Sequence, residues 1–94
     1  MIEYLHDSIR VAKGTEATIE AKITDGKNPV KDACHLMLFD DVELIGTYHG
    51  TYSDGTDTWV FTIPKEDTDR KGRYWYCICQ EANRLCFKQP IYFE

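Results

Sequence analysis

Short runs of alternating apolar and polar residues make up much of the chain. The clearest run is residues 15–26, TEATIEAKITDG, in which every second residue from Ala17 to Ile23 is apolar. A period of two residues brings these side chains onto one face of a β-strand, so the strand should cover a core with one face and meet water with the other. Asp25-Gly26 then ends the strand as a turn.

Similar runs, each bounded by turn residues, predict an all-β protein with about seven antiparallel strands packed as a sandwich. Trp59, Phe61 and Ile63 should share one face of their strand. Pro90 should place the last strand at a sheet edge or in a bulge, because proline cannot donate a ladder hydrogen bond. The stretch KEDTDRKG should be a polar crossing with at most one helical turn. The other expected strands are SIRVAK at an edge, CHLMLFDD in the centre and apolar on both faces, and RYWYCICQ with LCFKQPIYFE as a final hairpin. VELIGTYHG and TYSDGTDTWVFTIP should form two strands joined near His49-Gly50 or Ser53-Asp54-Gly55.

Composition and charge narrow the classes of function. The chain of 94 residues is long enough for one domain, residues 1–94. A hydrophobic share of 43% argues against disorder, and an aromatic share of 13% supplies large rings to a small core. The net charge of −5 would repel a phosphate backbone, so we expect no nucleic-acid partner. The chain has neither a signal-peptide pattern nor an apolar run of the ~20 residues that a membrane span needs, so we expect no membrane association.

Cys77, Cys79 and Cys86 lie within ten residues of one another. Cys77 and Cys79 should project to the same face of a strand. A turn at residues 82–83 or 81–84 would place Cys79 directly opposite Cys86, at a Cα separation that permits a disulfide. A three-residue loop would change the register and remove this pairing.

The thiols have four interpretations. In a reducing cytosol we expect free thiols that fill the core, since free cysteine behaves as a small hydrophobe. The alternatives are a Cys79–Cys86 disulfide and a zinc site that adds Cys34 or His35. Zinc sites usually separate paired cysteines by two to four residues, whereas one residue separates Cys77 from Cys79. A catalytic thiol would need a neighbouring base, and His35 should point to the opposite face from Cys34.

No other group of residues indicates catalysis or metal binding. His6, His35 and His49 lie on separate segments without the spacing of metal ligands. The acidic residues in 40–43 and 54–57 do not follow a calcium-binding loop, and solvated loop acids are the simpler interpretation. We therefore expect no cofactor, no metal and no enzymatic activity.

The stretch EDTDRKGRYWY resembles the signature of strand F in immunoglobulin domains. Gly72, Tyr74 and Tyr76 fill the places of its glycine, its buried corner tyrosine and its core residue. The resemblance implies that the hydroxyl of Tyr74 is tied to the backbone upstream. Tyr76 stands where antibody domains have a cysteine, so packing should replace the inter-sheet disulfide, with Trp59 and Trp75 supplying bulk.

The stretches VAKGTEATIEAKITDGKNPVKDA and TWVFTIPKEDTDRKGRYWYCI resemble small immunoglobulin-like domains of tailed-bacteriophage virions. They are similar to the N-terminal domain of upper baseplate proteins, and the resemblance covers nearly all of the chain. It implies a non-enzymatic structural protein of the tail, baseplate, neck or capsid decoration. Such a protein is made in the host cytoplasm and docks on other virion proteins, in many copies of a symmetric assembly.

The two terminal segments are the first candidates for partner binding. Their apolar residues exceed what a free tail needs, although terminal strands often complete a sheet instead. The candidate partner-binding residues are Ile2, Tyr4, Leu5, Ile91, Tyr92 and Phe93.

Two other functions stay open. One is a cytosolic binding module or inhibitor of a host protein, whose acidic surface would mimic a nucleic acid. The other is a carbohydrate-binding sandwich for host attachment, which needs exposed aromatic residues such as Tyr48, Tyr52 or Trp75 along one sheet.

Overall fold

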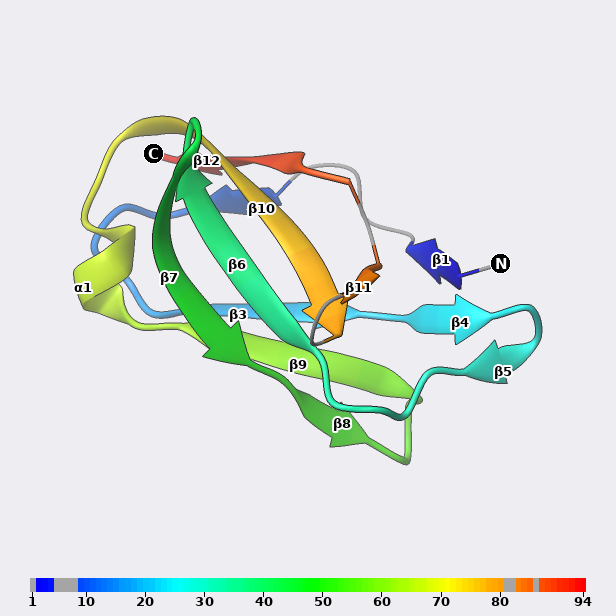
Figure 1. The fold of residues 1–94 in the computed structure, drawn as a ribbon. Coiled ribbons are helices and arrows are strands. Elements are labelled where there is room, and N and C mark those ends of the chain that lie inside the picture. The colour runs from blue at the N-terminus through cyan, green and yellow to red at the C-terminus, as the bar shows by residue number, and fades with distance from the viewer. Residues whose placement is uncertain (1, 5–8, 81–82, 86) are drawn as a thin grey trace.

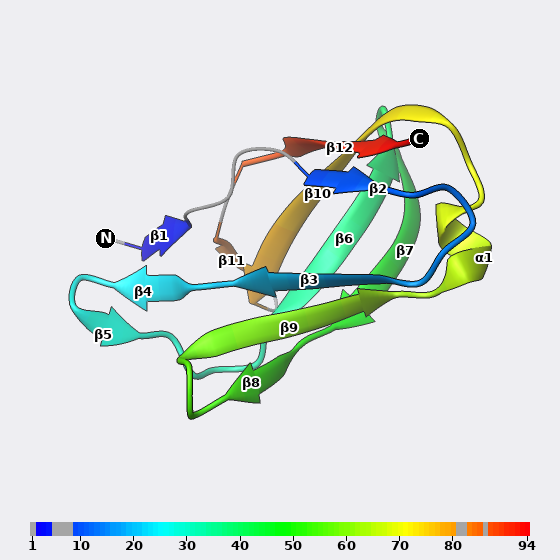
Figure 2. The same ribbon diagram turned by 180° about the vertical axis from the view of Figure 1, so that it is seen from behind.

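A computed structural model describes residues 2–4, 9–80, 83–85 and 87–94. Two sheets face each other across a core, and Figures 1 and 2 show them from opposite sides. We call the first one the large sheet. Its strands follow the order β2 (Ile9–Val11), β12 (Gln89–Phe93), β10 (Gly72–Gln80), β6 (His35–Asp40) and β7 (Glu43–His49), and β11 (Asn83–Arg84) pairs with the end of β10.

The facing sheet, which we call the small sheet, lies behind the large one in Figure 1 and in front of it in Figure 2. Its strands follow the order β3 (Ala17–Ala21), β9 (Thr58–Ile63) and β8 (Thr51–Ser53). A third, short sheet extends β3 at the end of the molecule where the N-terminus lies (Figure 1). Its strands are β1 (Ile2–Tyr4), β4 (Ile23–Asp25) and β5 (Asn28–Pro29).

Alternation of side chains builds the core, as the sequence predicts. Along β3, Ala17, Ile19 and Ala21 are buried and the residues between them are exposed. Opposite them on β9, Phe61 and Ile63 are fully buried, as is most of Trp59. The large sheet contributes the fully buried core residues Leu36, Leu38, Tyr76, Ile78, Ile91 and Phe93, and β4 of the short sheet contributes Ile23.

Two expectations about strand position are wrong. Pro90 does not lie on an edge strand, because β12 runs between β10 and β2. Proline is tolerated there because the pairing with β2 starts only at Ile91, one residue further along. Nor are all pairs antiparallel: β2 and β12 run parallel, since they come from opposite ends of the chain and no hairpin joins them.

Two other expected strands are each divided in the structure. The run from Ala17 to Asp25 breaks at Lys22 into β3 and β4, and TYSDGTDTWVFTIP divides at residues 54–57 into β8 and β9. The expected joint at His49-Gly50 is present as the boundary between β7 and β8, where the chain leaves the large sheet and enters the small sheet. β6 is central, as expected, but it is fully buried on one face only, because Met37 and Phe39 are half-exposed.

The polar crossing between β9 and β10 contains one helical turn, α1 (Lys65–Thr68), as predicted. Its last residue, Thr68, is fully buried. The Thr68 hydroxyl donates to the Thr15 carbonyl at 2.6 Å, and the Thr68 carbonyl accepts from the Gly14 amide at 3.1 Å. Thr68 therefore joins this crossing to the loop between β2 and β3. No helix in the described ranges is long and apolar enough to cross a membrane.

The residues of the predicted strand-F signature have distinct roles. Gly72 has a φ of 109°, which a side chain would strain, and Tyr76 is fully buried in the core. The ring of Tyr74 packs edge-on against Phe93. Its hydroxyl bonds to no backbone atom of the described residues, so the expected tie to the backbone upstream is not made by Tyr74; Thr68 makes such a tie, to the Thr15 carbonyl.

The two tryptophans lie on different sides of the molecule. Trp59 fills the core, and its indole nitrogen donates to the Val30 carbonyl at 2.7 Å. Trp75 alternates with the buried Tyr76, so it lies on the opposite face of the large sheet and is half-buried. The expectation that both rings supply core bulk is therefore wrong for Trp75, because the period of two along β10 turns it away from the core.

Candidate interaction surface

The large sheet has a second face, turned away from the small sheet, which we call the outer face. Strand register places its side chains in rows. In one row, Arg73 of β10 lies beside Tyr92 of β12, which lies beside Arg10 of β2. In the next row, Trp75 lies between Pro90 and Phe39. β12, β10 and β6 each pair with a strand on both sides, whereas β2 is an edge strand, so the rows rest mainly on three internal strands of the sheet.

Cationic groups lie over three aromatic rings of the outer face. The guanidinium carbon of Arg10 is 5.0 Å from the centre of the Tyr92 ring, and that of Arg73 is 5.0 Å from the Trp75 ring. The Lys88 ammonium nitrogen is 4.1 Å from the centre of the Phe39 ring and also donates to the Asp41 carbonyl at 3.1 Å. Each contact is favourable because the ring face is electronegative. The rings therefore hold these cations close to the sheet.

Large apolar side chains border this platform. Leu44 lies opposite Phe39 on β7 and is 47% exposed, and Val42 in the preceding turn is 82% exposed. Phe87, which immediately precedes Lys88, is 81% exposed. Exposed large apolar residues on one part of a surface are typical of a site that contacts another molecule.

The outer face is basic although the chain is acidic. Arg10, Arg73 and Lys88 extend from it, and so does Arg84, which lies opposite Cys79. At its margin, Glu94 forms an ion pair with Arg10. The net charge of the whole chain is −5, so the acidic residues that outnumber the basic ones belong to the rest of the chain.

The thiols of β10 also project to the outer side of the large sheet, where both are buried. Cys77 and Cys79 are 1% and 7% exposed, and their sulfur atoms are 3.7 Å apart, which confirms that they share a face. The predicted hairpin register is wrong: Gln80 pairs with Asn83, and Arg84 rather than Cys86 lies opposite Cys79. The pairing is displaced by two residues from the expected one. Cys79 has a free thiol, and Cys86 lies outside the described residues.

Cys34 is a poor candidate for catalysis or metal binding. Burial raises the pKa of its thiol to about 11, and the nearby charges of Asp32 and Cys79 add to the effect. Its sulfur donates a hydrogen bond to the Asp32 carbonyl at 3.3 Å. A thiol that stays protonated at neutral pH is neither a strong nucleophile nor a ready zinc ligand. Among the described side chains, no group of three or more histidine, cysteine or acidic residues is arranged to hold a metal.

The histidines are closer together than their sequence positions indicate. His35 and His49 lie opposite each other on β6 and β7, and their ring centres are 6.2 Å apart. His35 also lies opposite Cys79 on its other side. This places a thiol and two imidazoles in one row across the outer face, and His6 lies outside the described residues.

The terminal candidates have different positions. Ile91 and Phe93 are 0% and 1% exposed, so they complete the sheet and cannot contact a partner. Their neighbour Tyr92 points the other way, onto the outer face. Ile2 and Tyr4 bound β1, which pairs with β4, and Leu5 lies outside the described residues.

The aromatic residues proposed for carbohydrate binding do not line one sheet. Tyr48 is opposite the buried Leu36, and its hydroxyl donates to Asp67 at 2.8 Å. Tyr52 is opposite the buried Trp59 and donates to Asp57 at 2.7 Å. Both rings point toward the core side, whereas Trp75 is on the outer face, so these three residues do not supply the single exposed row that carbohydrate binding would need.

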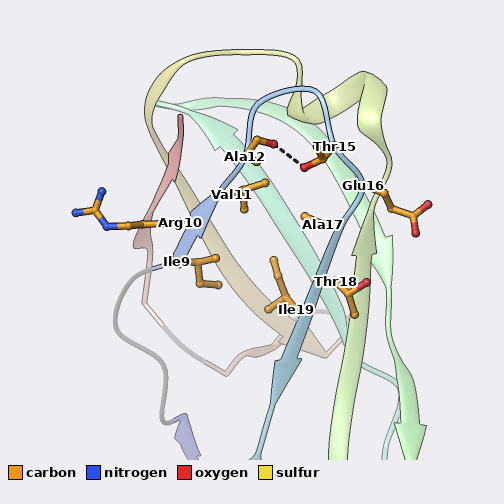
Figure 3. A pocket seen from close by; sticks show the side chains of 9 residues that line it. All are labelled: Ile9, Arg10, Val11, Ala12, Thr15, Glu16, Ala17, Thr18 and Ile19. Atoms are coloured by element: carbon orange, nitrogen blue, oxygen red, sulfur yellow. Dashed lines mark hydrogen bonds between the residues drawn. The ribbon is translucent and has the colours of Figure 1, made fainter.

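A groove of ≈ 210 Å³ separates the edge strands β2 and β3, where the two sheets meet (Figure 3). Ile9, Val11 and Ile19 point into it, whereas Arg10 and Glu16 point away. Val11 and Ile19 are 8% and 4% exposed, so little apolar surface is open to a ligand. The groove is the seam between the sheets rather than a binding site.

Sequence reasoning did not find the main residues of the outer face, namely Arg10, Phe39, Arg73 and Lys88. One signal was available: Arg73 and Trp75 are two residues apart on one strand, so they must share a face. The neighbours on β6, β12 and β2 depend on pairing between distant segments, which the sequence does not state.

Comparisons with known proteins bear on the fold. No protein-family model matches the chain, and no curated protein matches it. Among solved structures, one that is similar is described as "Twitchin kinase region from C.elegans (Fn31-NL-kin-CRD-Ig26)", with a TM-score of 0.52 and 14% identity. The match covers 99% of this chain and 16% of the twitchin chain, so this chain corresponds to a small part of the length of that structure. With the strand order described above, the likeness shows that the chain folds as an immunoglobulin-like β-sandwich.

Proposed function

We propose that this protein is a non-enzymatic structural component of a bacteriophage virion that acts by docking on other virion proteins. The outer face supports the docking role. It combines half-buried rings, cations held over them and exposed apolar side chains at its border, which are features of protein interfaces. The virion setting rests on the resemblance of residues 11–33 and 58–78 to phage immunoglobulin-like domains.

A rigid sheet suits this role. The middle of the outer face is carried by β12, β10 and β6, which pair on both sides, so Tyr92, Arg73, Trp75 and Phe39 are placed before a partner arrives and little ordering is needed on binding. In a symmetric particle, repeated copies would add many such contacts, so a weak single contact suffices for stable attachment. The tail, baseplate, neck and capsid surface all offer such repetition.

Mass spectrometry of purified virions tests the proposal. We expect the protein at a defined number of copies per particle, retained after washing in low salt. Its absence from the particle would overturn the virion role and favour the cytosolic binding module of a host protein.

A further inference from the structure

The outer face also indicates the chemistry of its partner, and this inference rests on the proposed docking function. Arg73 and Arg10 flank Tyr92 in one row, and Lys88 reaches over Phe39 in the next. Each cation lies over a ring on one side, which leaves hydrogen-bond donors of the guanidinium or ammonium group for another molecule. Such held cations suit carboxylates, which arginine binds through two parallel hydrogen bonds.

We propose that the outer face binds an acidic surface segment of a partner protein, one that carries aspartate or glutamate among apolar residues. The carboxylates would pair with Arg73, Lys88 and Arg84, and the apolar residues would contact Leu44 and Phe87. Arg10 contributes less, because Glu94 already pairs with it. The sign of the charge selects the partner, and the exposed apolar side chains supply the area that is removed from water.

A second copy of this chain, bound through the same face, fits this surface poorly. Two-fold pairing would bring Arg73 and Lys88 of one copy against the same basic face of the other. Facing like charges oppose association. The chain's own basic face therefore disfavours a face-to-face homodimer.

A nucleic acid also fits less well, although it is anionic. Binding by stacking needs open ring faces, and cations occupy faces of Tyr92, Trp75 and Phe39. A phosphate backbone longer than the sheet would also meet the acidic remainder of a chain whose net charge is −5. A short acidic protein segment avoids both difficulties.

Fluorescence anisotropy with a labelled random copolymer of glutamate and tyrosine tests the proposal on the purified protein. We expect binding in low salt that weakens as salt is added. Arg73→Glu with Lys88→Glu should weaken it by about tenfold or more, because two attractions become repulsions. The matched control is Lys22→Glu with Lys27→Glu, which changes the net charge equally at exposed positions off the outer face and should weaken binding by less than about twofold.

The variant Arg73→Gln with Lys88→Gln removes both charges without introducing repulsion, and it shows whether weaker binding comes from the charges rather than from misfolding. We expect it to weaken binding several-fold and to leave the circular dichroism spectrum unchanged. Three outcomes would overturn the proposal: no binding of the copolymer in low salt, equal losses in the outer-face and control variants, or tighter binding of oligothymidylate than of the copolymer. Because the assay uses no virus particles, its failure is distinct from failure of the virion role.

Discussion

Cys34 shows how burial sets the chemistry of one side chain. It is 2% exposed, and burial raises the pKa of its thiol from 9.0 to about 11. The neutral thiol is then a small apolar group in the core and contributes to stability. From the sequence, Cys34 was a candidate zinc ligand; the sequence does not reveal the degree of burial that makes it unreactive.

The stability that Cys34 provides should decline in alkali. The unfolded thiol ionises near pH 9 and the folded one near pH 11, so between these values the unfolded chain binds fewer protons and gains stability relative to the folded state. One such group lowers the free energy of unfolding by up to about 1.4 kcal/mol per pH unit in this window. Urea unfolding of the wild type and of Cys34→Ala measures this, and the difference between the two proteins should shrink only above pH 9. A difference that stays constant up to pH 11 would contradict the prediction.

At the scale of elements, the junction of β7 and β8 is the most sensitive to a small change. There the chain leaves the large sheet for the small one at Gly50, whose amide donates to the Cys34 carbonyl at 2.9 Å. A β-carbon at Gly50 would lie 2.6 Å from a ring carbon of Phe61 and 2.9 Å from one of Trp59. Both rings are buried, so they have little room to move.

We expect Gly50→Ala to lower the free energy of unfolding by about 1–3 kcal/mol, the usual cost of overpacking a core. Gly55→Ala is the control, because a β-carbon there meets no atom within 4 Å. Urea unfolding monitored by tryptophan fluorescence compares the two. Equal stabilities for the two variants would show that the rings yield to the added methyl group.

Most elements could be predicted from the sequence, and their pairing could not. The alternation in β3 and β9 and the polar composition of α1 are local patterns, and the structure confirms them. The hairpin after β10 shows the limit. The pairing differs from the expected register by two residues, so Arg84 lies opposite Cys79, and the sequence of residues 79–86 contains no strong turn signal that favours one register over the other.

At the scale of the whole molecule, the two ends of the chain close the sandwich together. β2 pairs only with β12 among the described strands. The Lys13 amide donates to the Glu94 carbonyl at 2.8 Å, and the Glu94 amide donates to the Val11 carbonyl at 2.9 Å. The last strand is therefore needed to hold the first residues of the large sheet.

A chain shortened to residues 1–88 should lose cooperative unfolding. It lacks Ile91 and Phe93, which are 0% and 1% exposed, and β2 loses its neighbour. Loss of even one such core side chain typically costs about 2–5 kcal/mol, which is much of a small domain's stability. Thermal unfolding followed by circular dichroism tests this, with Tyr92→Ala as a control on the outer face of the same strand. A cooperative transition in the shortened chain would show that β12 is dispensable.

The sequence by itself determined the fold class and, where alternation is clear, the side of a strand that is buried, because alternation with a period of two is a local property of an extended chain. It placed Trp59, Phe61, Ile63 and the alternate residues Ala17, Ile19 and Ala21 of β3 on the core side. Only the tertiary structure decided which strands are neighbours: it put β12 between β10 and β2, and it assembled Arg10, Tyr92, Arg73, Trp75, Phe39 and Lys88 into one face. Register between segments far apart in the sequence depends on turn positions and on the packing of the whole core, so no local pattern could reveal it.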